Sequence, residues 1–179
     1  MEEGKRGGSP QALIVRIVLV VAALGLVAGF FLPWASADAE FRDAVALAPD
    51  LVFYEPTGMT VSDATDISLL EYAQVYGSMG EGTAWQIYMI IMYGVLAVSV
   101  VTLLLAALGK PVGASIMAVL VLAGSRLLVW DFGDRGVLPN STHDWGIAPT
   151  IYIIAFVILL AAAVWLFVMK RKVKAGASA

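Results

Sequence analysis

Ionisable side chains that could do chemistry gather near residues 126–144. Arg126 lies inside an apolar run, where an ionisable group often marks a functional site. Asp131, Asp134, His143 and Asp144 follow, and their carboxylates could bind a hard cation. A simpler explanation is structural: Arg126 pairs with Asp131 or another outer carboxylate, or extends to the interface, and the others form a solvated acidic rim. We therefore treat these five as candidate binding residues and predict no metal site.

Residue types that most enzymes need are scarce in this chain. There is no cysteine, which excludes thiolate chemistry and iron–sulfur clusters. The single histidine, His143, has no visible nucleophile partner, and no phosphate-binding loop or nucleophile motif occurs. A net charge of −3 argues against nucleic-acid binding. The sequence predicts a protein that is not an enzyme and has no cofactor.

The elements that hold these side chains are apolar runs. Residues of apolar type make up 60% of the chain and charged residues only 14%, which is typical of a protein embedded in lipid. Four runs, 13–32, 85–108, 112–130 and 147–169, are long enough to cross a hydrocarbon core of about 30 Å. We expect an all-α membrane protein, a bundle of four transmembrane helices, because lipid offers no partner to an open strand edge.

Charge predicts the orientation of the spans. Eight of the eleven basic residues lie in the tail 1–12, at the start of the first run, in the turn 109–111 and in the tail 170–179. Twelve of the fourteen acidic residues lie in the segments 33–84 and 131–146. The positive-inside rule therefore predicts a multi-pass protein of the plasma (inner) membrane with both termini cytoplasmic. The basic tail 170–179 is expected to contact anionic lipid.

The acidic segment 33–84 is expected to form a small extracytoplasmic cap between the first and second spans. A short helix is expected over 38–47, and strands over 51–54 and 59–61 flank a turn at 55–58. A second helix is expected over 67–76, with Asp66 as its N-cap, although Ser68 and Glu71 also have capping-box spacing.

Aromatic and small residues add two further expectations. Tryptophans near the ends of the runs are expected to anchor the protein at the membrane interfaces. Glycines within the runs are expected to let helices approach closely, in this bundle or in a dimer. The expected anchors are Trp34, Trp85, Trp130 and Trp145, and the expected packing glycines are Gly25, Gly29, Gly113 and Gly124.

The first apolar run could also be interpreted as a signal peptide that is cleaved from the chain. Residues 35–37 (Ala-Ser-Ala) have the small-x-small pattern of a signal-peptidase site. The apolar run before them is longer than a typical signal-peptide core of about 7 to 15 residues. We therefore expect the first helix to be retained.

The exit from the first span, Phe31-Leu32-Pro33-Trp34, resembles that of claudin-type tetraspan proteins. The layout is also similar, with a long first outer loop, a tight inner turn and a shorter second outer loop. The claudin family carries a Gly-Leu-Trp motif and two cysteines in its first loop, and this chain has neither. The resemblance therefore implies topology alone. The same exit is similar to that of small bacterial four-helix membrane proteins.

These observations predict a non-enzymatic accessory or scaffold protein. It would bind a membrane-protein partner, or a second copy of itself, through the acidic outer segment and the membrane helices. One alternative is a small transporter or channel subunit that uses Arg126 and the acidic mouth. A third is a membrane enzyme with His143, Asp131 and Asp134 at its outer face.

Overall fold

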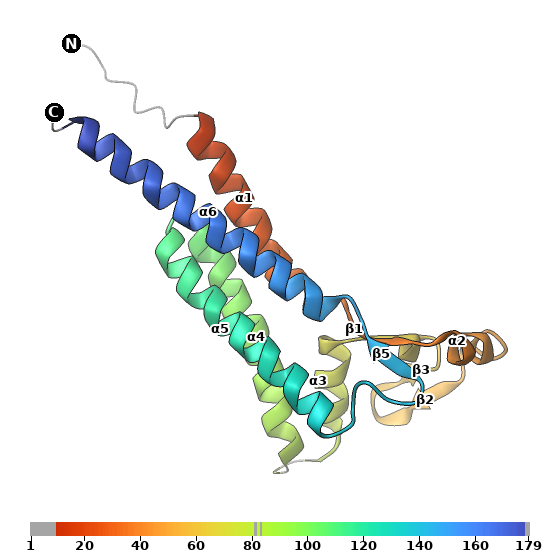
Figure 1. The fold of residues 1–179 in the computed structure, drawn as a ribbon. Helices are drawn as coiled ribbons and strands as arrows, with labels where there is room; N and C mark the ends of the chain where they lie inside the picture. The colour runs from red at the N-terminus through yellow and green to blue at the C-terminus, as the bar shows by residue number, and fades with distance from the viewer. Residues whose placement is uncertain (1–9, 81, 83, 178–179) are drawn as a thin grey trace.

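The computed structural model describes residues 10–80, 82 and 84–177, with side chains described as far as residue 171. Four long helices dominate it: α1 (Pro10–Ala28), α4 (Ala84–Ala107), α5 (Pro111–Asp134) and α6 (Ala148–Ala177) (Figure 1). Each contains a stretch long and apolar enough to cross a membrane. The chain is therefore mostly helical and compatible with a multi-pass membrane protein, as its apolar runs predict.

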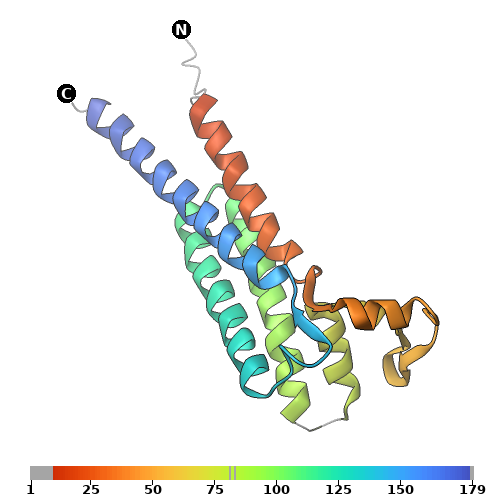
Figure 2. The ribbon, with the colours of Figure 1, turned by 45° about the vertical axis from the view of Figure 1, so that its right-hand side comes forward.

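The four helices pack as a bundle. α1 lies against α6 and α4, and α5 lies against α4 and α6. The ends of α1 and α6 that lead to the two termini point the same way (Figure 2). The tight α4–α5 turn forms as the sequence predicts, because Gly109 adopts a φ of +68° and Pro111 opens α5.

The helix ends differ from the expected spans. α1 ends at Ala28, and a turn follows in which Leu32 N donates to Ala28 O. α5 continues four residues beyond Trp130, to Asp134, because its last turn packs against the cap and buries Phe132. α6 continues to Ala177, so the basic tail belongs to a helix. The expected outer loop 131–146 therefore starts within α5.

The bundle is mostly apolar both inside and on its surface. Among the described side chains, the buried hydroxyls of its helices belong to Ser99, Thr102, Ser125 and Tyr152. The Ser and Thr hydroxyls each donate to a backbone carbonyl of their own helix at 2.7 to 2.8 Å, whereas the Tyr152 hydroxyl has no partner among the described residues. Many Ile, Leu and Val side chains instead face outward. An outer surface of this kind suits hydrocarbon.

The cap contains strands, so an all-α architecture is only part of the fold. β1 (Pro33–Ala37) is the central strand of a sheet of order β4–β1–β5, where β4 is Asp66–Ser68 and β5 is His143–Trp145. Both neighbours are antiparallel to β1. The cap therefore combines both outer segments, whereas the sequence predicts it from the first alone.

The rest of the cap lies between β1 and α4. Its elements are α2 (Ala39–Val45), β2 (Val52–Tyr54), the 3-10 turn η1 (Glu55–Thr57), β3 (Met59–Thr60), the 3-10 turn η2 (Asp63–Thr65) and α3 (Leu69–Ser78). β2 and β3 pair as the expected hairpin. In Figure 1, α2 and this hairpin extend away from the bundle, whereas α3 lies along the outer part of α4.

The N-cap of α3 is Ser68, so the expectation of Asp66 is wrong. The Ser68 hydroxyl accepts from Glu71 N, and the Glu71 carboxylate accepts from Ser68 N at 2.6 Å. This is the capping box that the spacing offered as the second possibility. Asp66 is instead in β4, where it pairs with Arg42.

Candidate functional site

Trp34 joins the cap to the bundle. The structure buries this side chain completely, so the expectation of an interface anchor is wrong. Its indole N–H donates to Gly29 O at 3.1 Å, and its ring meets those of Phe132 and Tyr152 edge-on. A Cβ at Gly29 would lie 2.8 Å from Tyr152 Cε2, so glycine is required there. Aromatic packing and this hydrogen bond therefore fix where the chain enters the cap.

The other tryptophans occupy different environments. Trp130 is 68% exposed on the outside of α5, as an interface anchor would be. Trp85 stacks on Tyr76 of the cap with ring centroids 5.6 Å apart, and Trp145 is half-buried in β5. These two therefore contribute to packing in the outer part of the molecule.

The other expected packing glycines lie at contacts between helices. A Cβ at Gly25 would lie 3.2 Å from Ala155 Cβ of α6. Cβ atoms at Gly113 and Gly124 would lie 3.3 Å from Leu105 and 3.0 Å from Val95, both of α4. The α1–α6 and α4–α5 pairs therefore approach closely where a side chain is lacking.

Arg135, which the sequence analysis missed, organises the outer ends of α3, α4 and α5. Its guanidinium donates to Asp131 Oδ2 and, at 2.9 Å, to Tyr76 Oη, and it lies 4.2 Å from the Tyr88 ring centroid. Burial alone would lower the pKa of Arg135, but the hydrogen bonds with Asp131 and Tyr76 outweigh this and raise it. The i, i+4 spacing of Asp131 and Arg135 was the available sequence signal.

Arg126 has a different environment on the same helix. It is exposed on the outside of α5, and the described side chains give it no hydrogen bond or ion pair. The predicted Arg126–Asp131 ion pair is wrong, because Arg135 takes that carboxylate.

His143 is part of the cap interior. Its side chain is buried, with 8% of its surface exposed, and packs 5.0 Å from the Phe41 ring. Nε2 lies 2.7 Å from Ala64 O, which can only accept, so Nε2 carries a proton. Nδ1 lies 2.9 Å from Thr142 Oγ1. Both ring nitrogens are therefore engaged, and the contact of Nε2 with Ala64 O joins β5 to the first outer segment.

The candidate residues do not converge on one site. Asp131 is at the α3–α5 junction and His143 is inside the cap, whereas Asp134 and Asp144 are exposed. The Asp144 carboxylate accepts from Trp145 N at 2.7 Å. Within residues 10–80, 82 and 84–177, no group of three His, Asp or Glu side chains is arranged to hold a metal ion.

A second ion pair stabilises the cap. The Arg42 guanidinium donates to Asp66 Oδ1 at 2.9 Å, and the Ser36 hydroxyl donates to the same oxygen at 2.7 Å. Partial burial would raise the pKa of Asp66, but these two hydrogen bonds lower it below its usual value. Arg42 and Arg135, the basic residues of the outer segments, are thus both held in ion pairs. Most outer carboxylates keep an uncompensated charge.

The cap ends in an exposed apolar surface. We define the cap tip as Leu47, Leu51, Val52 and Phe53, which lie where α2 leads into β2. All four are more than half exposed, and Leu47 is 88% exposed. Asp43, Asp50 and Glu55 are exposed beside them. Exposed apolar surface rimmed by polar residues commonly marks an interaction site.

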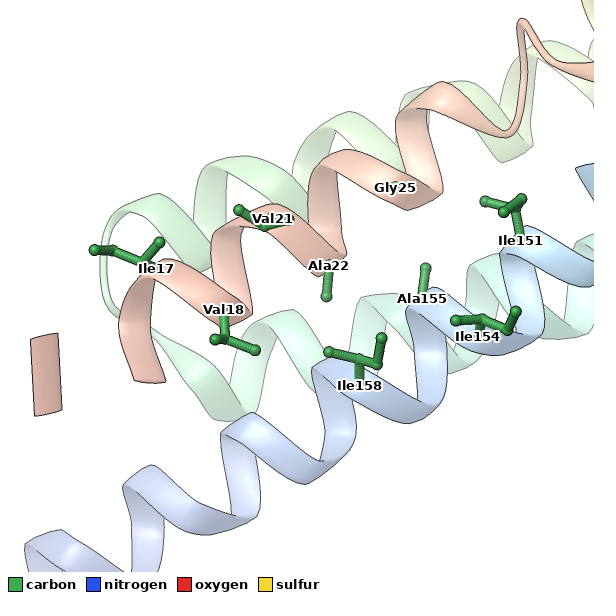
Figure 3. Close-up of a pocket in the computed structure, with 9 residues that line it drawn as sticks. All are labelled: Ile17, Val18, Val21, Ala22, Gly25, Ile151, Ile154, Ala155 and Ile158. Carbon is green, nitrogen blue, oxygen red and sulfur yellow. The ribbon is translucent and has the colours of Figure 1, made fainter. Parts of the chain in front are cut away.

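The helix bundle has a lateral apolar groove between α1 and α6, with a volume of about 420 Å³. Its walls are formed by Ile17, Ile151, Ile154 and Ile158 (Figure 3). Its floor is formed by Ala22, Gly25 and Ala155. None of its lining residues is charged. The groove can therefore accept hydrocarbon and offers no group for chemistry.

Comparison with known proteins adds no further constraint. The chain matches no protein-family model, no curated protein and no solved structure. The functional argument therefore depends on the geometry of the cap and of the bundle.

Proposed function

We propose that this protein is a non-enzymatic membrane accessory or scaffold protein that binds another protein through its cap tip. The observation that carries the proposal is the exposure of Leu47, Leu51, Val52 and Phe53 on a cap that is otherwise well packed. Phe53 contacts Phe41, which packs on His143, so the cap tip rests on an ordered core. A rigid apolar surface loses little conformational freedom when it binds.

Charge defines the kind of partner. The carboxylates beside the cap tip have no basic side chain to neutralise them, because both outer arginines are in ion pairs. The cap tip would therefore bind a partner surface that is apolar at its centre and carries Lys or Arg at its rim. The basic tails support a topology with cytoplasmic termini and an extracytoplasmic cap.

The apolar interior of the bundle weighs against a transporter. Its buried Ser and Thr hydroxyls donate to their own helices, and Arg126 faces outward from the bundle. Ion-coupled transport usually needs ionisable groups that face the interior or a water-filled cavity. An enzyme with His143 at its centre would need that ring free, and both of its nitrogens are engaged.

Partner co-purification from native membranes tests the proposal. Leu51→Ser with Phe53→Ser removes the apolar surface of the cap tip and leaves the ion pairs in place. Met79→Ser is the matched control, because Met79 is an exposed apolar residue of the same outer segment outside the cap tip. We expect the double variant to lose a protein that the wild type and Met79→Ser retain. An unchanged set of co-purified proteins in the double variant would overturn the proposal.

Topology is tested separately, because the chain has no cysteine of its own. We expect Ser62→Cys, in the cap, to react with a membrane-impermeant maleimide on intact cells. Ser178→Cys should react only after permeabilisation. The reverse pattern would contradict the proposed orientation.

A further inference from the structure

A second groove lies between α5 and α6, close to the ends of these helices that neighbour the two termini. Its volume is about 230 Å³, and its walls are Val112, Ser115, Ile116, Ala163, Val164 and Phe167. The Ser115 hydroxyl donates to Pro111 O at 2.9 Å, so the only polar side chain of the lining is already satisfied. The groove itself therefore suits hydrocarbon.

Two cations lie close to lining residues at one end of this groove. Lys110 directly precedes α5, two residues before Val112, and is exposed. Arg171 is one helical turn beyond Phe167, and its guanidinium lies 4.4 Å from the Phe167 ring centroid. As far as side chains are described, neither cation has a hydrogen-bond or ion-pair partner. An apolar groove thus has two uncompensated positive charges near one end.

We propose that this groove binds an anionic phospholipid from the leaflet nearest the termini. One acyl chain would lie along the apolar walls, and the phosphate would lie between Lys110 and Arg171. Basic pockets between membrane helices bind anionic headgroups because the charge attraction adds to the burial of the chain. Stacking on Phe167 restricts the Arg171 side chain, which lowers the entropy lost on binding.

The α1–α6 groove provides an internal comparison. It is larger, about 420 Å³, yet none of its lining residues is charged. It can accept any hydrocarbon chain, but it has no group that would select a headgroup. The α5–α6 groove is smaller and has cations at one end, so charge complementarity favours an anionic lipid there.

Native mass spectrometry of the full chain tests this site. The protein is reconstituted into vesicles of equimolar dioleoyl phosphatidylglycerol and dioleoyl phosphatidylcholine, extracted in mild detergent, and analysed for retained lipid. We expect the wild type to retain phosphatidylglycerol preferentially. Lys110→Gln and Arg171→Gln should each reduce this preference about fivefold, since one cation near an anionic surface contributes about 1 kcal/mol. The double variant should lose the preference.

Matched controls separate this groove from a diffuse attraction to the basic tail. Lys170→Gln removes a neighbouring exposed cation that is not stacked on Phe167, and it should leave the preference unchanged. Val164→Trp should obstruct the groove and reduce retention of both lipids, whereas Val157→Trp, at an exposed site on α6 outside this groove, should not. Equal retention of the two lipids by the wild type would overturn the proposal. So would a preference that survives in the double variant, or one that Lys170→Gln weakens as much as Arg171→Gln.

Discussion

The bundle and the cap are held together by different interactions. Within the bundle, helices meet at small residues such as Gly124, and the buried Ser and Thr hydroxyls bond to their own helices. The cap relies on long-range polar contacts, among them Arg42 with Asp66 and His143 with Ala64. We infer that side-chain packing at the helix contacts dominates the stability of the bundle, whereas ion pairs and close backbone pairing dominate that of the cap.

The largest expected effect comes from Gly146, where the second outer segment meets β1. A Cβ there would overlap Pro33 O, a backbone atom that cannot move aside without separating the strands. We expect Gly146→Ala to destabilise the protein by about 3 kcal/mol. The measurements are the apparent melting temperature in detergent and hydrogen exchange of the β5 amides.

Gly94→Ala is the control for that prediction. Nothing lies within 4 Å of a Cβ at Gly94, which is inside α4. The substitution should therefore stabilise the helix by up to about 1 kcal/mol. Equal melting temperatures for the two variants would show that the β1–β5 contact contributes little.

The second effect concerns the junction between bundle and cap. Arg135→Met should leave the Asp131 carboxylate and Tyr76 hydroxyl without their donor, at a cost of about 2 kcal/mol. Asp131→Leu with Arg135→Met should cost less than the sum of the single changes, because the two residues form one pair. Additive losses in thermal unfolding would show that the two side chains act independently.

The smallest effect is a pH dependence confined to the cap. Since the folded pKa of Asp66 is lowered, its ionised form stabilises the cap at pH values above the unfolded pKa of about 3.9. That contribution is lost as the pH falls through the folded pKa. The protection of β1 and β4 amides, corrected for the intrinsic exchange rate, should therefore fall below about pH 3.9, whereas that of α4 and α5 amides should not.

Asp66→Asn tests the assignment of that acid response. It should remove most of the pH dependence of exchange in β1 and β4. Asp50→Asn, at an exposed carboxylate outside the ion pair, should leave it intact. An acid response that persists in Asp66→Asn would assign it to another group.

The four long apolar helices and the α4–α5 turn could be predicted because their signals are local. A long apolar run predicts a helix of matching length, and Gly109 followed by Pro111 predicts the turn between two helices. The choice between Asp66 and Ser68 as N-cap could not be made locally. It depends on Arg42, which is distant in the sequence and pairs with Asp66.

The contacts that shape the cap were also beyond local prediction. Trp34 has the sequence context of an interface tryptophan, and only its contacts with Phe132 and Tyr152 reveal a buried role. The structural role of His143 was missed for a similar reason. It depends on the strand pairing of Ala37 with His143, which joins segments more than one hundred residues apart and has no local signal in the sequence. The small residues of the Ala-Ser-Ala pattern are explained by the same strand, where Ala35 and Ala37 are buried.

β1 is bonded to both outer segments and follows α1 after a short turn. Any sliding or rotation of α1 along its axis must therefore pull on β4 and β5 together. The first helix and the sheet form one mechanical linkage, in which a movement of the bundle is transmitted to the cap through a single strand.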